Sequence, residues 1–302
     1  MLDLSSIQNL ASSIKYLTME PKNPQTGSAT IDQLQKYAKD LAEVYQLKKG
    51  KVKELHTAKQ ELFKYADDLN QTIVELKTAN QELQESYLDT IHRLALAAEY
   101  KDEDTGDHIV RMSRYCALIA NKRGLTPMEV HHILYASPMH DIGKIGVPDV
   151  ILMKPGKLTD EEFDTMKTHT TIGAKILAHS KSEILKVAEQ IALYHHEKWN
   201  GTGYPHGLSG DTIPLAARIV ALADTFDALT SKRPYKDPYP FEVACDIIKK
   251  ERSQHFDPAI VDVFLENIDE IGKIKQKTHS KSSLFLAKVT TSDRYQSEGK
   301  NE

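Results

Sequence analysis

The chain of 302 residues is 40% hydrophobic and 27% charged, which is typical of a soluble protein with a sizeable core. Its net charge of -4 argues against a nucleic-acid polymer as the partner. The two cysteines, Cys116 and Cys245, lie too far apart for a CxxC metal site and favour a reducing compartment. Because we find no signal peptide and no stretch of ~18 apolar residues, we expect a cytoplasmic protein with no membrane span.

Residues 1–30 are expected to form a short N-terminal segment, in which a helical pattern ends at the turn-rich stretch PKNPQTGSAT.

Over residues 31–86, leucines recur every seven positions, and a second, mostly apolar series precedes them by three residues. The leucine series, interrupted only at Lys48, is Leu34, Leu41, Leu55, Leu62, Leu69, Leu76 and Leu83. This heptad repeat predicts a coiled coil that joins two copies of the chain, and Asn80 in the second series favours a parallel pair. Gly50 is its weak point, because glycine costs ~1 kcal/mol in a helix interior. The alternative, a helix that packs on its own domain, fits so narrow a stripe less well.

Beyond about Gln84 the apolar stripe broadens, and we expect the same helix to enter a globular domain over residues 87–274. Further helices are predicted over residues 108–124, 126–143, 159–180, 182–199, 214–231 and 240–254. Convincing strand alternation is absent, so the predicted fold class is all-α. Residues 275–302, rich in Lys, Ser and Thr, are expected to form a flexible C-terminal tail.

Histidines and carboxylates gather within the predicted domain. A lone helical histidine is more often a surface or core residue, so only the combination points to a metal site. Nitrogen and oxygen donors together suit Mn, Fe, Zn or Ni, and the scarcity of sulfur argues against a structural zinc site. His140 and Asp141 are adjacent, and adjacent helical side chains point ~100° apart. They can therefore bind one metal ion from a helix end, or two ions through a bridging carboxylate. Lys144 returns to the same face as Asp141 and could meet a phosphate oxygen.

Three separated stretches, HDIGKIGVPD, HHEKWNGTGYP and ADTFDALTSKRPYK, resemble in this order the motifs of the HD-GYP family within the HD phosphohydrolase superfamily. The resemblance covers about residues 87–274. It implies an HD-type helical domain, here preceded by a long coiled-coil helix, with two or three divalent metal ions, usually Fe or Mn. It implies an enzyme that hydrolyses the bacterial second messenger cyclic di-GMP to pGpG, and often on to GMP.

The resemblance also assigns residues to roles. The implied metal ligands are His108, His140, Asp141, His169, His195, His196 and Asp224, and Asp104 stands where related chains place a carboxylate ligand for a third ion. Asp141 would bridge two ions, and a hydroxide held between them would attack phosphorus. Lys144 would contact the substrate phosphate, and Tyr204 the guanine end. Arg233 and Lys236 are implied ligand contacts, although their spacing alone indicates a solvated basic turn.

Two alternatives stay open. The domain could be a module that binds a cyclic dinucleotide, or a GGDEF-domain partner, with little turnover. It could also be a phosphodiesterase for cyclic GMP-AMP, since base selection depends on the shape of the pocket. No receiver or sensor domain is recognised, so the input signal is expected to come through a partner, such as an upstream sensor, or through the short N-terminal segment. Glu197 is expected to be structural, and His131 and His132 to be ordinary helix residues.

Overall fold

The computed structural model describes residues 9, 12, 27–101, 107–232 and 237–277, and the following statements concern these residues. Every regular element among them is a helix, and the only β-type pairing described is an isolated bridge between Arg252 and Phe256. The predicted all-α fold class is therefore confirmed. The chain divides into two units between Glu82 and Leu83. The domain boundaries given above stay predictions.

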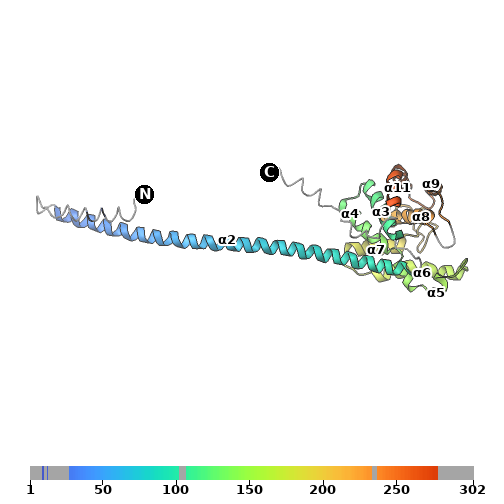
Figure 1. Cartoon of the computed structure of the whole chain (residues 1–302), viewed down its shortest axis with the longest axis horizontal. Coiled ribbons are helices and arrows are strands. Elements are labelled where there is room, and N and C mark those ends of the chain that lie inside the picture. The colour runs from blue at the N-terminus through green and yellow to red at the C-terminus, as the bar shows by residue number, and fades with distance from the viewer. Residues whose placement is uncertain (1–8, 10–11, 13–26, 102–106, 233–236, 278–302) are drawn as a thin grey trace. The chain divides into compact units, whose positions relative to one another are not determined.

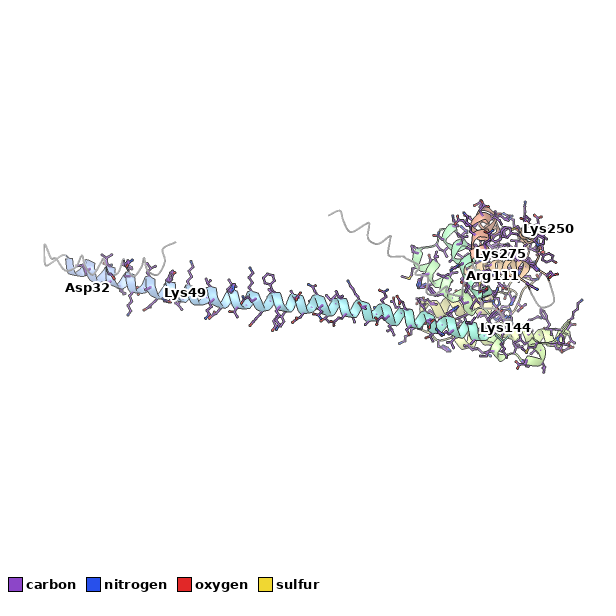
Figure 2. All side chains as sticks on the ribbon, in the orientation of Figure 1. Asp32, Lys49, Arg111, Lys144, Lys250 and Lys275 are labelled. Atoms are coloured by element: carbon purple, nitrogen blue, oxygen red, sulfur yellow. The ribbon has the colours of Figure 1, made fainter. Side chains whose placement is uncertain are left out.

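The first described helix, α2, runs without a break from Gly27 to Glu99 (Figure 1). It passes through Gly50, where a Cβ atom would meet nothing within 4 Å. Figure 2 shows side chains projecting on all sides of α2 over most of its length. Its leucines are accordingly exposed, with Leu55 at 71% and Leu62 at 68%. One long helix was predicted here; its pairing into a coiled coil stays a prediction.

A set of shorter helices forms the second unit. They are α3 (Asp107–Lys122), α4 (Pro127–Ala136), η1 (Ser137–Met139), η2 (Ile142–Gly146), α5 (Asp149–Leu152), α6 (Asp160–Leu177), α7 (Glu183–Tyr194), η3 (Gly210–Thr212), α8 (Leu215–Thr230), α9 (Phe241–Lys250), α10 (Pro258–Glu266) and α11 (Ile268–Lys277). The η elements are short 3₁₀ helices. Helices α10 and α11 were not predicted from the sequence.

Local sequence explains where several of these helices begin. Thr126 and Glu129 form a capping box at the start of α4, and Thr159 and Glu162 form another at the start of α6. In each box the threonine side chain accepts a backbone N–H and the glutamate binds the N–H of the capping residue, so two donors at the helix end are satisfied. Asp257 caps α10 by a single hydrogen bond, which its side chain accepts from the N–H of Ala259.

The single helix predicted over residues 126–143 was wrong. Helix α4 ends at Ala136, and two short 3₁₀ turns follow. Pro138 lies in the first turn, and because proline lacks a backbone N–H it cannot extend the α-helical ladder. Asp141 lies between the turns with φ -103° and ψ 11°, outside the helical region. This break turns the adjacent side chains of His140 and Asp141 toward one centre.

The core lies between α3 and α8, which pack against each other. Phe226 on α8 is fully buried and makes edge-to-face contacts with three aromatic rings, at centroid distances of 5.6 Å to Tyr115, 4.9 Å to Phe264 and 5.6 Å to Phe241. Such pairs add to the stabilisation gained from burying apolar area. Cys116 is buried in this core, and burial raises the pKa of its thiol. The same two helices carry His108 and Asp224, so the core fixes their positions.

Candidate metal centre

The seven predicted ligands that the structure describes come together in two adjoining groups. One group consists of Asp141, His169, His195 and His196, and the other of His108, His140 and Asp224; within each, the potential ligand atoms lie within 4.8 Å of one another. They come from α3, the break between η1 and η2, α6, the end of α7, and α8. Asp104, Arg233 and Lys236 lie outside the described residues.

Asp141 stands between the two groups. Its Oδ1 lies 3.3 Å from Nε2 of His169 and 3.5 Å from Nε2 of His195. Its Oδ2 lies 3.2 Å from Nε2 of His140 and 2.8 Å from Nζ of Lys144. Each oxygen of this carboxylate therefore faces a different group, which is the arrangement that a carboxylate bridging two cations requires.

Several donor atoms in this centre are buried without a hydrogen-bond partner. They are Asp141 Oδ1 and the Nε2 atoms of His140, His169 and His195. Each unpaired buried polar atom costs ~1–3 kcal/mol, and native structures contain few of them. Four that gather around Asp141, across the two groups, indicate a binding site for positive ions. The donor set of imidazole nitrogens and carboxylate oxygens fits Mn, Fe or Zn.

Backbone carbonyls fix which nitrogen of each ring faces the centre. The Nδ1 of His140 lies 3.1 Å from the carbonyl of Ser137, and that of His169 lies 2.7 Å from the carbonyl of Met166. The Nδ1 of His195 lies 3.0 Å from the carbonyl oxygen of Ile191. A carbonyl only accepts hydrogen bonds, so each Nδ1 must carry the proton. Each Nε2 then presents its lone pair to the centre, as a metal ligand does.

His108 is oriented by a carboxylate instead. Its Nδ1 lies 2.8 Å from Oδ2 of Asp227, and Arg111 donates to both oxygens of Asp227 over 2.7 and 2.8 Å. Burial opposes the positive charge on His108, but the hydrogen bond and charge of Asp227, together with the charge of Asp224, raise its pKa to about 10. Burial likewise opposes ionisation of Asp227, yet His108 and Arg111 outweigh it and lower its pKa.

Asp227 and Arg111 were not predicted from the sequence. Asp227 lies three residues after Asp224 on α8, and Arg111 lies three residues after His108 on α3. Residues three apart share a helix face, so this spacing was the available signal. It is weak by itself, because an isolated helix does not reveal which face meets a metal centre.

Three ionisable groups of the centre are shifted toward the states that bind cations, whereas the burial of His140 is outweighed by the charges of Asp141 and Asp224, which raise its pKa. Burial lowers the pKa of His169 to about 4, and burial with the charge of His195 lowers that of His196 well below its usual value. Both rings are therefore neutral near pH 7. Burial opposes ionisation of Asp141, but Lys144 and His140 outweigh it, so its pKa falls well below the usual range.

The loop after the histidine pair folds back over it. The buried carboxylate of Glu197 accepts the backbone N–H of His206 over 2.8 Å and that of Leu208 over 3.0 Å. The ring of Tyr204 consequently stacks on His196, with centroids 4.8 Å apart. A Cβ atom on Gly203 would lie 2.3 Å from the backbone nitrogen of Lys198, so only glycine fits this close approach. Tyr204 thereby forms one wall beside the candidate ligands, and Glu197 is structural, as expected.

Among the residues that the structure describes, no further histidine joins the two groups. His131 lies on α4 with its ring 4.6 Å from that of Tyr135, and neither it nor His132 belongs to either group. His206 is exposed.

Within the described parts of the chain, no helix combines the length and apolar character that crossing a membrane requires.

Residues 93–260 match the profile of a family described as an HD domain. The chain is 44% identical over 199 residues to a cyclic di-GMP phosphodiesterase response regulator of Xanthomonas campestris, covering 66% of this chain and 53% of the relative. It is 44% identical over 204 residues to a cyclic di-GMP phosphodiesterase of Thermotoga maritima, covering 67% and 55%. It is 43% identical over 194 residues to a 3'3'-cGAMP-specific phosphodiesterase of Vibrio cholerae, covering 64% and 37%. The chain thus spans about half the length, or less, of these curated relatives.

Proposed function

The chain belongs to the HD domain family, and we propose that it is a metal-dependent phosphodiesterase that hydrolyses cyclic di-GMP to pGpG and, in a second step, to GMP. The observation that carries this proposal is the convergence of buried, unpartnered donor atoms around Asp141. Relatives at 44% identity that are named cyclic di-GMP phosphodiesterases support the choice of substrate.

We propose that His140, Asp141 and the other five described ligands hold two divalent ions, with Asp141 as the bridge and Fe or Mn as the metal. The two adjoining donor groups support two ions. Ions bound in this way act as Lewis acids and lower the pKa of bound water toward ~7. A third ion near Asp104 would add to this centre, and that residue lies outside the described part of the chain.

The side chains around the centre supply orientation and charge. The ammonium of Lys144 lies 2.8 Å from Asp141 Oδ2, so it could donate to a phosphate oxygen held beside the bridge. Such a donor stabilises negative charge that builds up on phosphate oxygens during displacement. Tyr204 closes one side of the site through its stacking on His196, which supports it as a contact for the base. Arg233 and Lys236 are proposed as further contacts on the basis of the resemblance alone.

Turnover of cyclic di-GMP by protein loaded anaerobically with Mn(II) or Fe(II) tests this function. The double substitution His140→Ala with Asp141→Ala should abolish the appearance of pGpG and GMP. A matched control is His131→Ala with His132→Ala, which removes another adjacent pair outside both donor groups and should retain turnover. Metal-loaded wild-type protein that hydrolyses no cyclic di-GMP would refute the assignment.

The same assay should be run in parallel with 3'3'-cGAMP. A relative 43% identical to this chain is named as specific for that dinucleotide, which favours it as the second candidate substrate. Preferential hydrolysis of 3'3'-cGAMP would keep the reaction class and replace the substrate. Binding of either dinucleotide without hydrolysis would favour the binding-module alternative.

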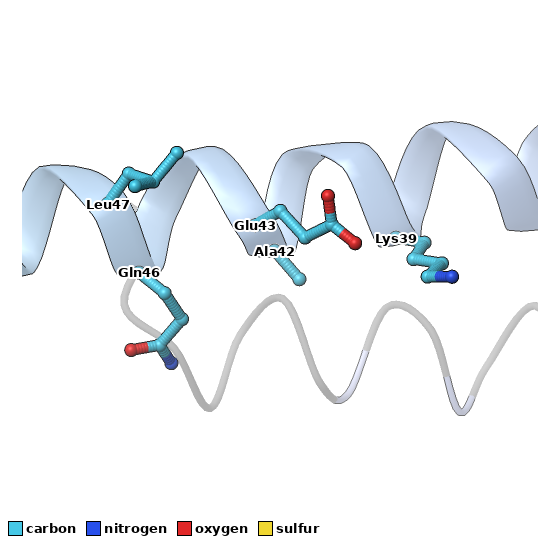
Figure 3. A pocket seen from close by; sticks show the side chains of 5 residues that line it. All are labelled: Lys39, Ala42, Glu43, Gln46 and Leu47. Carbon is cyan, nitrogen blue, oxygen red and sulfur yellow. The ribbon is translucent and has the colours of Figure 1, made fainter.

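We also propose that α2 pairs with a second copy of the chain. Its exposed leucines, among them Leu62 and Leu69, are spaced as the d positions of a heptad. Burying a leucine side chain stabilises by ~1.5–3 kcal/mol, so a seam of them favours association. With the leucines at d, the hollow shown in Figure 3 is lined by no a or d position of the seam: its residues are Lys39, Ala42, Glu43, Gln46 and Leu47.

Sedimentation at micromolar concentration tests the pairing. Leu62→Lys with Leu69→Lys should give monomers, while Gln60→Lys with Gln71→Lys adds the same charge at b and f positions and should leave a dimer. A monomeric wild-type protein would refute the coiled coil.

A GGDEF-domain partner, an upstream sensor and a cytoplasmic location stay predictions. The free state of Cys116 and Cys245 is compatible with a cytoplasmic location.

A further inference from the structure

Lys101 makes an unusual set of contacts just after the end of α2. Its Nζ lies 2.8 Å from the carbonyl oxygen of Val147, 3.0 Å from that of Ile145 and 3.3 Å from that of Lys144. It also lies 3.2 Å from Oδ1 of Asp149. All four acceptors fall within a stretch of six residues that includes the end of η2. The ammonium group of Lys101 thus donates hydrogen bonds to three backbone carbonyls at the end of this 3₁₀ turn.

The turn that Lys101 holds carries the centre of the proposed site. Asp141, the proposed bridging ligand, lies directly before η2, and Lys144, the proposed phosphate contact, lies within it. In Figure 2, Lys144 is labelled beside the C-terminal end of α2, which agrees with the contact between Lys101 and the Lys144 carbonyl. The backbone that Lys101 contacts is therefore continuous with Asp141 and Lys144, the two residues proposed to act on the metal ions and the substrate.

The opposite side of the turn is held by packing against α6. A Cβ atom on Gly143 would lie 1.8 Å from the carbonyl oxygen of His169 and 2.5 Å from the backbone nitrogen of Gly173. The backbones of η2 and α6 thus touch where His169, another proposed ligand, is located. Contact with α6 fixes one side of the turn, and Lys101 satisfies carbonyls at its other end, where a helix leaves acceptors unpaired.

We propose that Lys101 is a positioning residue that fixes the 142–147 turn, and through it Asp141 and Lys144, in the geometry required for metal binding and hydrolysis. This inference rests on the proposed function for its role in catalysis. The ion pair with Asp149 adds little, because that carboxylate is 70% exposed and surface pairs contribute ~0–1 kcal/mol. The three carbonyl contacts carry the effect.

Lys101→Met tests the role, since methionine keeps an unbranched chain and removes the ammonium. The matched control is Lys122→Met, which makes the same change at an ion pair with Glu270 on the surface. Cobalt(II) titration of each metal-free variant, followed by the visible spectrum, reports ligand geometry independently of turnover. Lys101→Met should weaken Co(II) binding by ~10–100-fold and alter the spectrum, as loss of outer-shell support does. Lys101→Arg should recover part of the loss, and Lys122→Met should match wild type.

Kinetics with cyclic di-GMP provide the second readout. Lys101→Met should lower kcat at saturating metal, because Asp141 and Lys144 would be misplaced. Lys101→Arg should restore part of the lost kcat. If Lys101→Met does not fold, Lys101→Gln replaces it in both measurements. An unchanged Co(II) affinity and spectrum in the folded variant would overturn the inference. If wild type binds Co(II) but hydrolyses no cyclic dinucleotide, the proposed function fails, and Lys101 is still judged by the spectra.

Discussion

Replacing Asp227 with asparagine would test how far the metal centre depends on support beyond its ligands. Asp227 is completely buried and accepts hydrogen bonds from Arg111 over 2.7 and 2.8 Å and from Ser231 over 3.2 Å, while His108 Nδ1 lies 2.8 Å away. Asparagine has nearly the same volume but carries no charge and one acceptor oxygen fewer. The change leaves the guanidinium of Arg111 buried without its counter-charge.

Two magnitudes follow from this geometry. Removing one partner of a buried ion pair costs ~3–5 kcal/mol of the free energy of unfolding. Loss of the carboxylate that orients His108 should weaken metal binding by ~10–100-fold, which is ~1.4–2.8 kcal/mol of binding free energy. Since domains are stable by ~5–15 kcal/mol, the variant should still fold at low temperature, and both effects can be measured.

The chain contains a matched control. Asp262 accepts two hydrogen bonds from Arg252 with the same two-pronged geometry, both over 2.8 Å, but that pair is about half exposed. Asp262→Asn should therefore cost only ~0.2–1 kcal/mol. Urea unfolding would give the stabilities, and Mn(II) titration followed by electron paramagnetic resonance would give the affinities. If Asp227→Asn matches Asp262→Asn in both, the proposed support of His108 is refuted.

Three further predictions concern the loop, the turn and pH. Glu197→Gln should cost ~1–3 kcal/mol of unfolding free energy, because one amide N–H loses its acceptor, and amide exchange should rise only within the loop at 200–208. Gly143→Ala should destabilise by about 3 kcal/mol or more, since its Cβ would lie 1.8 Å from the His169 carbonyl, whereas Gly50→Ala should stabilise α2 by ~1 kcal/mol; urea titrations that rank them otherwise would contradict the packing argument. The pKa of His108 in the metal-free protein is raised to about 10, so its contribution to stability is fully present below the unfolded value of ~6.5 and is lost as pH rises through 10. Because a metal must displace that proton, Mn(II) affinity should rise between pH 7 and 9, and a flat profile there would be inconsistent with this pKa.

Local patterns in the sequence were sufficient to predict much of the helical structure. The heptad leucines predicted the long helix α2, and capping threonines mark the starts of α4 and α6. The break after Ala136 was missed although Pro138 signals it, because the apolar periodicity on either side suggested one continuous helix. Helices α10 and α11 were missed where the chain shows no motif.

The candidate site was predictable only in part. His140 and His195 stand beside distinctive residues, an aspartate and a second histidine, so their motifs single them out. Asp227 and Lys101 act through partners more than forty residues away in sequence. Their roles arise from how α3 and α8, or η2 and the end of α2, meet in the folded chain. Periodicity along one helix does not indicate which other element that helix contacts, so the roles of these residues could be recognised only in the structure.

We propose that Asp141 bridges two metal ions held by the surrounding histidines and Asp224. Anomalous diffraction from crystals grown with Mn(II) tests this bridge most directly, because the signal locates the metal without reference to activity. We predict at least two peaks per chain that share Asp141, one beside His169, His195 and His196 and the other beside His108, His140 and Asp224. A single peak, or peaks that do not share Asp141, would show that Asp141 is not the bridging ligand.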